Sequence, residues 1–450
     1  MSKSIRLNEI YNSTTVIERI ATDRLILPDK ALRLFPKHVV RLAARLVEQF
    51  GFVDPLLVDQ NNKVVCGILY LLAAQLLGLT EVPVVRVTHL SDEQIRIYRI
   101  AEQRLTELTP WDKVALAEEF KFLSALELDF DLDITGFSTT EIDLHIASLD
   151  GEKTPNEDNI LVVLQHSPVT TPLDVWKLDH HRLICGSALD VSVWAILMEN
   201  HRASLVFTDP PYNVKIKGHV SGKGQVVHRE FAMASGGMTT ESYREFLRSF
   251  LQNAHDHSSE GALQYICIDW RHIDDVLAIG RSIYEALINV CCWVKPNAGM
   301  GSFYRSRHEL IPIFRRGKKS HRNNVELGRH GRNRSNVWEY AGATTFSGRT
   351  SDEGNTLAMH PTAKPVSMIA DAIMDSTARN EIVVDPFLGS GATLMAAERI
   401  GRRLYGIELD PLYVDVAIRR WQKQTGQDAI HVATGKTFNE LKSEGGQANV

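Results

Sequence analysis

Short apolar runs alternate with helical patterns from about residue 160 to residue 425, and this alternation constrains the fold more than any other feature of the chain. A strand, a helix and a further strand in this order form a parallel sheet with helices packed on its faces. We therefore predict an α/β fold with a doubly wound, mostly parallel sheet. The expected strands are 204–207, 264–268, 289–294, 309–314, 381–384 and 403–407, and the expected helices are 241–254, 273–287, 365–377 and 392–400.

The length of 450 residues is too great for one ordinary domain, and the pattern changes along the chain. Residues 18–100 alternate shorter strands and helices, which indicates a small α+β domain. A helical period follows as far as Leu149, and the polar segment Gly151–Asp158 is typical of a linker. We predict a small domain at 1–105, a helical connector and linker at 106–158, the α/β domain at 159–430 and a tail at 431–450 that is frayed from Lys436 onward.

Composition argues against several classes of protein. No apolar segment after a basic start resembles a signal peptide, and the most apolar run, Val64–Leu77, is too short for a membrane span. None of the five cysteines forms a Cys-x-x-Cys pair, so we expect no metal site and no dithiol chemistry. The expected protein is cytoplasmic, keeps its thiols reduced and has no contact with a membrane.

Asp209-Pro210-Pro211-Tyr212 is the sharpest local signal, and it directly follows an apolar strand. Two prolines fix the backbone at the strand exit and remove two backbone donors, which leaves their carbonyl groups available to a ligand that donates hydrogen bonds. An exocyclic amine is such a ligand, because Asp209 and a proline carbonyl can accept both of its protons. The ring of Tyr212 offers a flat surface on which a base can stack. The alternative interpretation is a rigid turn without a ligand.

A glycine-rich turn joins an expected strand to an expected helix at Asp385–Thr393. Gly389 and Gly391 allow the backbone to turn tightly beside a ligand, and the helix that follows can hold an anionic group at its N-terminus. The next strand ends at Glu408, about twenty residues further on, where a carboxylate can bind ribose hydroxyls. The lysine and the spacing of a phosphate-binding loop are absent, so a nucleoside without a phosphate chain is the better ligand.

A third segment, His360–Pro365, precedes the glycine loop and by itself indicates only the start of a helix. Together the three segments resemble the DNA amino-methyltransferases, in the permuted group in which Asp-Pro-Pro-Tyr precedes the glycine loop. The resemblance covers about residues 160–425 and includes Trp293–Pro296 and Tyr304–Glu309, as in phage-borne relatives. It implies a Rossmann-like methyltransferase fold.

The resemblance also implies an activity, which is transfer of a methyl group from S-adenosyl-L-methionine to the N6 amine of an adenine flipped out of double-stranded DNA. The sulfonium methyl group is already activated, so no metal ion and no covalent enzyme intermediate is required. The base site carried over from the family is Asp209, Pro210, Pro211 and Tyr212. The cofactor site carried over is Asp385, Phe387, Gly389, Ser390, Gly391, Thr393 and Glu408, with Thr362 and Lys364 nearby.

The net charge of −5 does not indicate a nucleic-acid-binding protein, but the distribution of charge is more informative than the sum. Residues 315–334 carry eight basic side chains against the single acid Glu326. A basic run is more often a solvated face, but its place beside the catalytic motifs favours DNA contact, with help from Lys215–His228. The predicted DNA-binding residues are Arg315, Arg316, Lys318, Arg322, Arg329, Arg332 and Arg334.

The N-terminal residues resemble the ParB-like domain, through Leu56–Val58, Val64–Gly67, Val82–Val84 and Glu102–Leu105. ParB proteins usually carry an arginine-bearing box after the strand glycine that is tied to nucleotide binding or hydrolysis. Here that stretch is Gly67–Tyr70 and has no arginine, which argues against CTP binding and nuclease activity. The resemblance implies a module that positions DNA or dimerises, with a homodimer and association with the bacterial nucleoid as expectations. The alternative is a structural appendage without DNA contact.

Three other functions stay open on the sequence. Aspartate at position 209 favours adenine, whereas serine is commoner in cytosine-N4 enzymes, but the rule has exceptions. A ParB-like DNA-binding regulator with a degenerate methylase body is a second alternative, against which the three intact motifs argue. An RNA or a protein glutamine is a third alternative for the acceptor, and the phage-like matches and the basic stretch disfavour it.

Overall fold

The computed structural model describes residues 16–126, 128–149, 167–213, 237–296, 298, 303–327, 334–340 and 364–447. The chain divides into two compact units, Met1–Ser138 and Thr139–Val450. This division falls inside the segment that we predicted to be a helical connector, because the last helix of that segment packs with the α/β unit. Each unit is described by itself.

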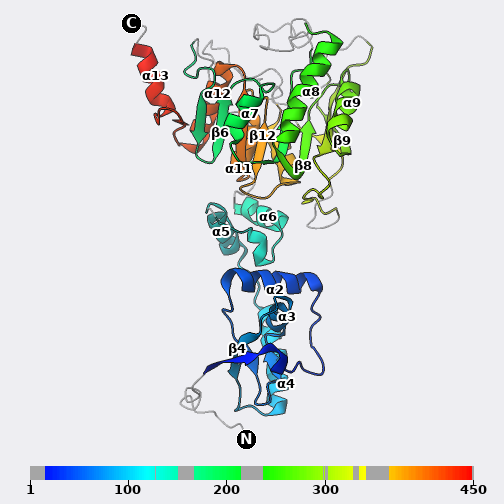
Figure 1. Cartoon of the computed structure of the whole chain (residues 1–450), viewed down its shortest axis with the longest axis vertical. Helices are drawn as coiled ribbons and strands as arrows, with labels where there is room; N and C mark the ends of the chain where they lie inside the picture. The colour runs from blue at the N-terminus through cyan, green and yellow to red at the C-terminus, as the bar shows by residue number, and fades with distance from the viewer. Residues whose placement is uncertain are drawn as a thin grey trace. The chain divides into compact units, whose positions relative to one another are not determined.

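The first unit, in which strand β4 is labelled in Figure 1, is built on a four-stranded sheet in the order β1-β4-β2-β3. Gly67 has φ 90°, and a Cβ at this position would lie 2.5 Å from Cδ2 of Leu56, so the turn between β3 and α3 requires glycine. Leu56, Leu71 and Val84 are fully buried in its core. The elements are β1 (Ile17–Ala21), α2 (Lys37–Phe50), β2 (Leu56–Val58), β3 (Val64–Cys66), α3 (Ile68–Leu76), β4 (Glu81–Arg86), α4 (Asp92–Leu108) and α5 (Lys113–Ser124).

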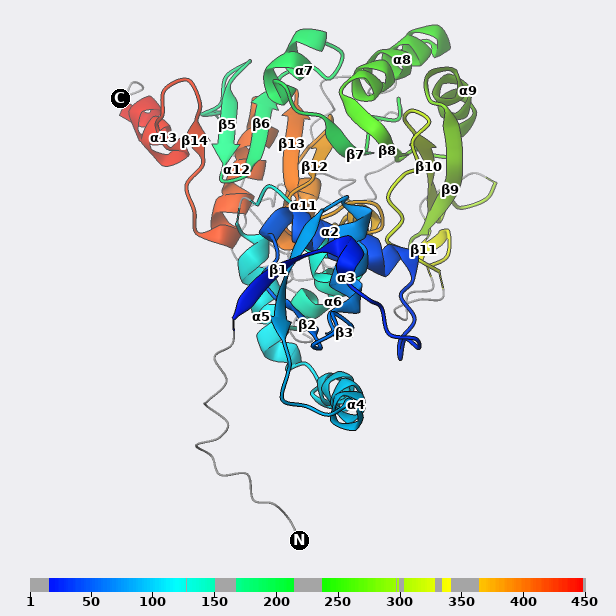
Figure 2. The same cartoon turned by 60° about the horizontal axis from the view of Figure 1, so that its bottom comes forward.

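The second unit contains a ten-stranded sheet in the order β11-β9-β10-β8-β7-β12-β13-β6-β5-β14 (Figure 2). Strands β8, β7, β12, β13 and β6 run parallel, and β10 is antiparallel to both of its neighbours. The predicted doubly wound, Rossmann-like sheet is therefore confirmed. The strands are β5 (Val175–Leu178), β6 (His181–Cys185), β7 (Ala203–Thr208), β8 (Ser258–Ile266), β9 (Ala286–Val294), β10 (His308–Arg315), β11 (Val337–Glu339), β12 (Ile382–Asp385), β13 (Arg403–Glu408) and β14 (Ile430–His431).

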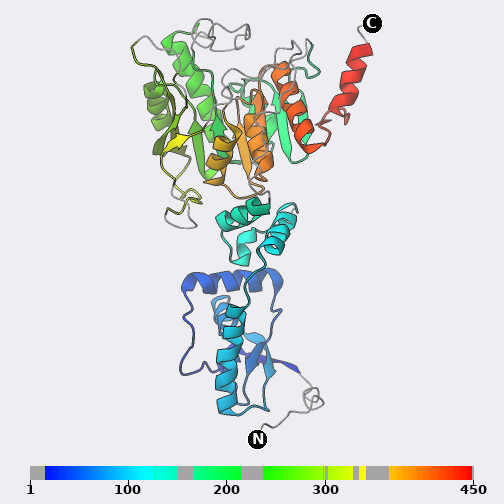
Figure 3. The ribbon, with the colours of Figure 1, turned by 180° about the vertical axis from the view of Figure 1, so that it is seen from behind.

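Helices cover both faces of this sheet because each face buries an apolar layer. Helices α7 (Val191–Met198), α8 (Thr240–Asp256) and α9 (Ile273–Ile283) lie on one face (Figure 1). Helices α10 (Val366–Met374), α11 (Ala392–Arg399) and α12 (Pro411–Thr425) cover the other, as the orange and red helices of Figure 3 show. The predicted helix 273–287 ends earlier, at Ile283, because Ala286–Val294 is drawn into β9 by its pairing with β10.

A buried ion pair ties α6 (Thr139–Leu149) to the second unit. The side chain of Arg402 is fully buried and donates to both carboxylate oxygens of Asp143, at 3.0 and 2.7 Å. Arg402 directly precedes β13, so α6 lies at the end of the sheet where the parallel strands begin. A buried charge pair holds its partners in one geometry, and α6 therefore belongs to the second unit rather than to a free connector.

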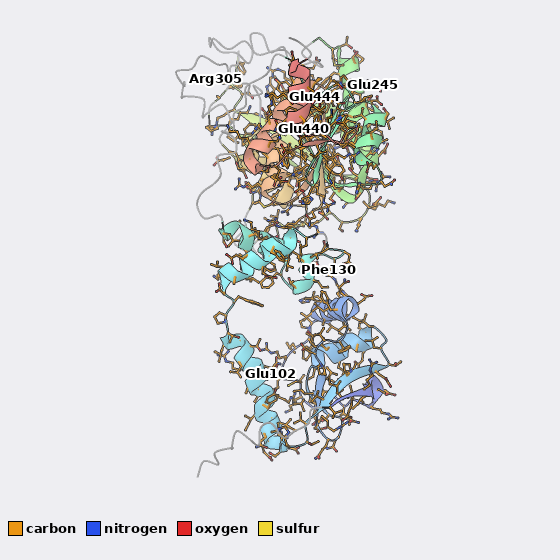
Figure 4. All side chains as sticks on the ribbon, turned by 90° about the vertical axis from the view of Figure 1, so that its left-hand side faces the viewer. Glu102, Phe130, Glu245, Arg305, Glu440 and Glu444 are labelled. Atoms are coloured by element: carbon orange, nitrogen blue, oxygen red, sulfur yellow. The ribbon has the colours of Figure 1, made fainter. Side chains whose placement is uncertain are left out.

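The expected frayed tail is wrong for most of its length. Residues 430–431 pair with β5, and α13 (Phe438–Gln447) carries Glu440 and Glu444, which are labelled in Figure 4. Phe438 is fully buried, with its ring 5.4 Å from that of Trp176. The buried ring of Phe438 anchors this mostly polar terminus. Its few apolar residues form too short a hydrophobic period for the sequence to predict the helix.

No helix among the described residues is long and apolar enough to cross a membrane. In the same part of the chain, no group of three or more histidine, cysteine, aspartate or glutamate side chains is arranged to hold a metal ion.

Candidate active site

Three motif carboxylates follow or end neighbouring strands of the second sheet. Asp209 comes directly after β7, Asp385 ends β12 and Glu408 ends β13, and these strands are adjacent and parallel. Parallel neighbours end at the same side of a sheet, which we call its carboxyl end, and ligands of open α/β sheets bind there. The topology therefore brings together two motifs that lie far apart in the sequence.

Asp209 is held by two other side chains at this end. The Tyr212 hydroxyl donates to Oδ1 of Asp209 at 2.6 Å, and Nζ of Lys364 donates to Oδ2 at 2.5 Å. Nζ of Lys364 also lies 3.2 Å from the Tyr212 hydroxyl oxygen. Lys364, which we predicted to lie near the cofactor, instead contacts the residues predicted to bind the base. Its ammonium group is buried, so the orientation of Asp209 is fixed before any ligand arrives.

Glu309 and Lys295 complete this cluster, and neither was predicted as a site residue although they lie in Tyr304–Glu309 and Trp293–Pro296. Glu309 accepts from the Tyr212 hydroxyl at 3.0 Å and lies 3.0 Å from Nζ of Lys364. Nζ of Lys295 donates to the other oxygen of Glu309 at 2.5 Å. Because β10 is antiparallel, its first residues lie at the carboxyl end of the sheet. No sequence signal indicates that direction, so Glu309 could not be assigned from the motif alone.

The cluster of Asp209, Glu309, Lys295 and Lys364 balances two carboxylates against two ammonium groups. Burial raises the pKa of Asp209, as does the charge of Glu309, while Lys364 opposes both. Burial also acts to raise the pKa of Glu309, but the ammonium groups of Lys364 and Lys295 outweigh it and bring this pKa to about 2. The pKa of Lys364 is raised because its two carboxylate partners outweigh the effect of burial. Glu309 is thus the permanent anion, and Asp209 is the better proton acceptor.

The proline carbonyls are not equivalent. The buried Tyr243 hydroxyl donates to the carbonyl of Pro211 at 3.1 Å, which fixes the backbone of the turn against α8. Asn213 closes the turn with a left-handed backbone, φ 53°, and its side chain pairs with the backbone of Met238 on both sides. With the Pro211 carbonyl engaged in the fold, the Pro210 carbonyl is the acceptor that remains for a ligand.

The glycine loop and the end of β13 form a second arrangement beside the first. Glu408 accepts from the backbone N–H of Gly389 at 2.8 Å with one oxygen and from that of Asp410 at 2.9 Å with the other. Asp385 accepts from the Thr393 hydroxyl at 2.6 Å and from the N–H of Phe387 at 3.0 Å. Both acids are therefore used to shape the loop.

Glycine is required in this loop by space as well as by dihedral angle. Gly391 has φ 84°, and a Cβ there would lie 2.9 Å from Cβ of Ala417 on α12. Ser390 is buried, and its carbonyl and hydroxyl oxygens accept from the Arg420 guanidinium at 2.7 and 3.3 Å. Phe387 packs against Phe246 and Phe250 of α8. The loop is thus held from both faces of the sheet.

Burial raises the pKa of both loop acids to about 7. The loop N–H groups oppose this effect at each carboxyl group, and so does the Thr393 hydroxyl at Asp385. Carboxyl groups with raised pKa values at neighbouring strand ends mark this loop as a candidate ligand site.

The residues of the basic run that the structure describes do not lie at this site. Arg315 is the last residue of β10, whose first residues contribute Glu309, so these positions lie at opposite ends of a strand of about 20 Å. Arg316 pairs with Glu260 at 2.7 Å, and the backbone N–H of Lys318 donates to the same carboxylate. All three residues therefore lie at the end of the sheet away from Asp209.

Two further members of the predicted set pair with acids of the same unit. Arg322 lies 3.4 Å from Glu381, and Arg334 lies 3.0 Å from Asp371 and 2.8 Å from Asp375. The Arg334 side chain is only 19% exposed, so its charge is largely committed to the fold. Their role in DNA binding stays a prediction that this geometry does not favour. Arg329, Arg332, Thr362 and Lys215–His228 lie outside the described residues.

Residues 203–419 match the model of the N6/N4 DNA methylase family. This segment is a DNA methylase domain of the N6/N4 family. Both motif regions, from Asp209 to Glu408, lie inside the match. The cofactor predicted from the sequence, S-adenosyl-L-methionine, is the methyl donor of this family.

Curated relatives of the methylase lie among bacterial modification enzymes. The chain is 26% identical over 236 residues to the type II methyltransferase M2.DpnII of Streptococcus pneumoniae, covering 50% of this chain and 85% of that protein. It is 24% identical over 275 residues to the type II methyltransferase M.HpaI of Haemophilus parainfluenzae, covering 58% of this chain and 80% of that protein. The crystal structure of the M1.HpyAVI–SAM complex is 18% identical, covers 53% of this chain and 98% of its own, and has a TM-score of 0.37.

A second family model matches residues 114–172 and describes them as a ParB-methyltransferase HTH domain. This segment includes most of α5 and all of α6, which we had predicted to belong to a helical connector and linker. The match supports the predicted combination of a ParB-like region with a methylase in one chain.

Proposed function

We propose that this methylase transfers a methyl group from S-adenosyl-L-methionine to the N6 amine of an adenine that is flipped out of double-stranded DNA. The observation that carries the proposal is the placement of Asp209 and of the Gly389–Glu408 arrangement at the carboxyl ends of adjacent strands. The Asp209 site suits the acceptor amine, and the Gly389–Glu408 arrangement suits the nucleoside of the methyl donor. Methyl donor and acceptor amine therefore meet across neighbouring strand ends. Because the target amine is inaccessible within a duplex, the base must leave the stack.

The acceptor amine is oriented by groups that are already in place. A carboxylate has about four acceptor positions, and Tyr212 and Lys364 use one on each oxygen of Asp209, so acceptor capacity for an amine proton remains. The Pro210 carbonyl takes the second proton, which directs the nitrogen lone pair away from both acceptors. The sulfonium of the bound cofactor supplies an activated methyl group. After transfer, Asp209, whose pKa is raised, receives the proton that the amine loses.

The residues that hold the cofactor follow from the loop geometry. Each carboxylate oxygen of Glu408 accepts one backbone N–H and keeps a second acceptor position for a ribose hydroxyl. The tight turn at Gly389 and Gly391 lets the backbone approach the nucleoside. Asp385 shapes the loop through Thr393 and the Phe387 N–H. Positioning and electrostatic acceptance of protons supply most of the rate enhancement, since the methyl donor needs no further activation.

The base specificity is tested by the product. Double-stranded genomic DNA without modification is incubated with the full chain and the cofactor, and the DNA is then digested to nucleosides and analysed by mass spectrometry. We expect N6-methyladenine. Finding only N4-methylcytosine would replace the base assignment and keep the enzyme class. Finding neither base, with DNA bound but no cofactor bound by calorimetry, would favour the DNA-binding regulator.

Cofactor affinity is expected to rise with pH. Glu408 has a pKa of about 7 and must be ionised to accept strongly from ribose hydroxyls, so affinity grows as pH rises through this value. Ionisation of one such group changes the dissociation constant by about tenfold at most between pH 6 and pH 8. Calorimetric titration of cofactor across this range measures the effect. Glu408→Gln should flatten the dependence, with Asp385→Asn as the comparison, and a wild-type slope in both variants would contradict the assignment.

A further inference from the structure

Exposed aromatic side chains gather around the carboxyl end of the sheet, where the mechanism uses none of them. Trp270 is 53% exposed, and Phe303 and Tyr304 are 86% and 82% exposed. Exposed aromatic side chains that lie together mark a candidate interaction surface. These side chains lie next to the base site rather than on the far side of the unit, so the partner that we expect is the DNA.

The register of the strands places these residues beside Asp209. The backbone N–H of Cys267 donates to the carbonyl of Thr208, which directly precedes Asp209. Ile268 forms an antiparallel bridge with Leu310, so Trp270, two residues further on, emerges opposite the start of β10. Phe303 and Tyr304 lie a few residues before that same start. Both groups therefore leave the sheet next to the strand end that carries the base site.

The turn at Trp270 is held in one conformation. Asp269 accepts from the backbone N–H of Arg271 at 3.0 Å and from its guanidinium at 2.7 Å. The Arg271 guanidinium lies 4.8 Å from the centre of the Trp270 ring, stacked as a cation–π pair. An ordered arginine over an exposed indole offers both a charge for phosphate and a flat surface for a base.

The segment before β10 repeats this combination. The rings of Phe303 and Tyr304 meet edge to face, with centroids 4.4 Å apart. Arg305, labelled in Figure 4, donates to the carbonyl of Ala298, and exposed Arg307 donates to the carbonyl of Lys295. Aromatic rings interleaved with arginines, close to the point where a base is extruded, have the composition of a surface that binds unstacked nucleotides.

We propose that Trp270 with Arg271, and Phe303 with Tyr304, stack on the bases that flank the flipped base and hold the opened strand at the active site. The inference rests on the proposed function and names a DNA surface separate from the described part of the basic run 315–334. Extrusion leaves neighbouring bases without a stacking partner, and exposed rings replace that partner. Arg271, Arg305 and Arg307 provide charge for the phosphates between these bases.

The test is binding of a fluorescein-labelled single-stranded oligonucleotide of mixed sequence to the full chain, followed by fluorescence anisotropy. Trp270→Ala and the double variant Phe303→Ala/Tyr304→Ala should each raise the dissociation constant about tenfold, because stacking contributes about 1–3 kcal/mol per base. Trp270→Phe, which keeps a ring, should recover most of the loss. The matched charge control is Arg316→Ala/Lys318→Ala at the other end of the sheet, which should bind like the wild type.

Two readouts separate this inference from the proposed function. Cofactor affinity should be unchanged in every variant, because the substituted side chains are exposed and lie outside the glycine loop. Wild-type affinity in Trp270→Ala and in the Phe303/Tyr304 double variant would overturn the inference, as would a loss confined to the Arg316/Lys318 control. Absence of DNA methylation by the wild-type chain would instead overturn the proposed function, whatever the anisotropy shows.

Discussion

Replacing Asp209 with asparagine is expected to slow methyl transfer on the order of 10²–10³-fold, the range found when one preorganised hydrogen-bonding group is lost from an active site. Asparagine keeps the shape and one acceptor oxygen, but it cannot receive a proton and turns an N–H₂ group toward the Tyr212 hydroxyl or the substrate amine. Single-turnover transfer of a labelled methyl group to DNA measures the effect.

Cofactor binding distinguishes a chemical role for Asp209 from a structural one. Glu408 and the glycine loop lie on the neighbouring strands, so Asp209→Asn should bind S-adenosyl-L-methionine as the wild type does. The variant should also fold, because Lys364 keeps its second carboxylate partner, Glu309. Turnover close to that of the wild type would remove Asp209 from the mechanism.

Replacing Lys364 with methionine is expected to lower the free energy of unfolding at pH 7 by about 3–5 kcal/mol, the range for removing one partner of a buried ion pair. The change leaves Asp209 and Glu309 in one buried cluster with Lys295 as the remaining cation. The loss of unfolding free energy is measured by chemical denaturation of the full chain, with the fluorescence of the second unit as the signal. Lys318→Met at an exposed position is the matched control and should change stability by no more than about 0.5 kcal/mol.

The pH dependence of the Lys364→Met variant gives a second check. Without the ammonium group, burial and mutual repulsion raise the folded-state pKa of the two carboxyls above their unfolded values. A carboxyl of this kind destabilises the folded state at neutral pH, and the destabilisation disappears as pH falls. The stability deficit should therefore shrink between pH 7 and pH 5, and Lys364→Met/Glu309→Gln should show a smaller deficit at pH 7. A deficit that is constant with pH would indicate lost packing instead of lost charge.

The core of the fold could be predicted from the sequence because it depends on local pattern. Apolar strands such as Leu205–Phe207 and Val383–Val384 are buried on both faces, so they read as continuous apolar runs. The motifs at Asp209 and Gly389 each follow such a strand. Since parallel strands share a carboxyl end, the meeting of the two motifs could be expected before any coordinates existed.

The site could be predicted only in part, because its other members depend on strand direction. Lys364 and Glu309 meet Asp209 from separate segments, and Glu309 does so only because β10 runs opposite to β8. The same reversal moves Arg315 away from the site that adjacent sequence suggested. The buried pair of Arg402 and Asp143 likewise joins residues that no local pattern connects.

The sequence by itself determined the α/β class, the glycine loop and the acceptor motif, because hydrophobic period and backbone chemistry act over a few neighbouring residues. Only the tertiary structure decided which charges neutralise one another and which aromatic rings stay exposed beside Asp209. These properties depend on distances between segments far apart in the chain, because electrostatic and stacking energies are set by those distances.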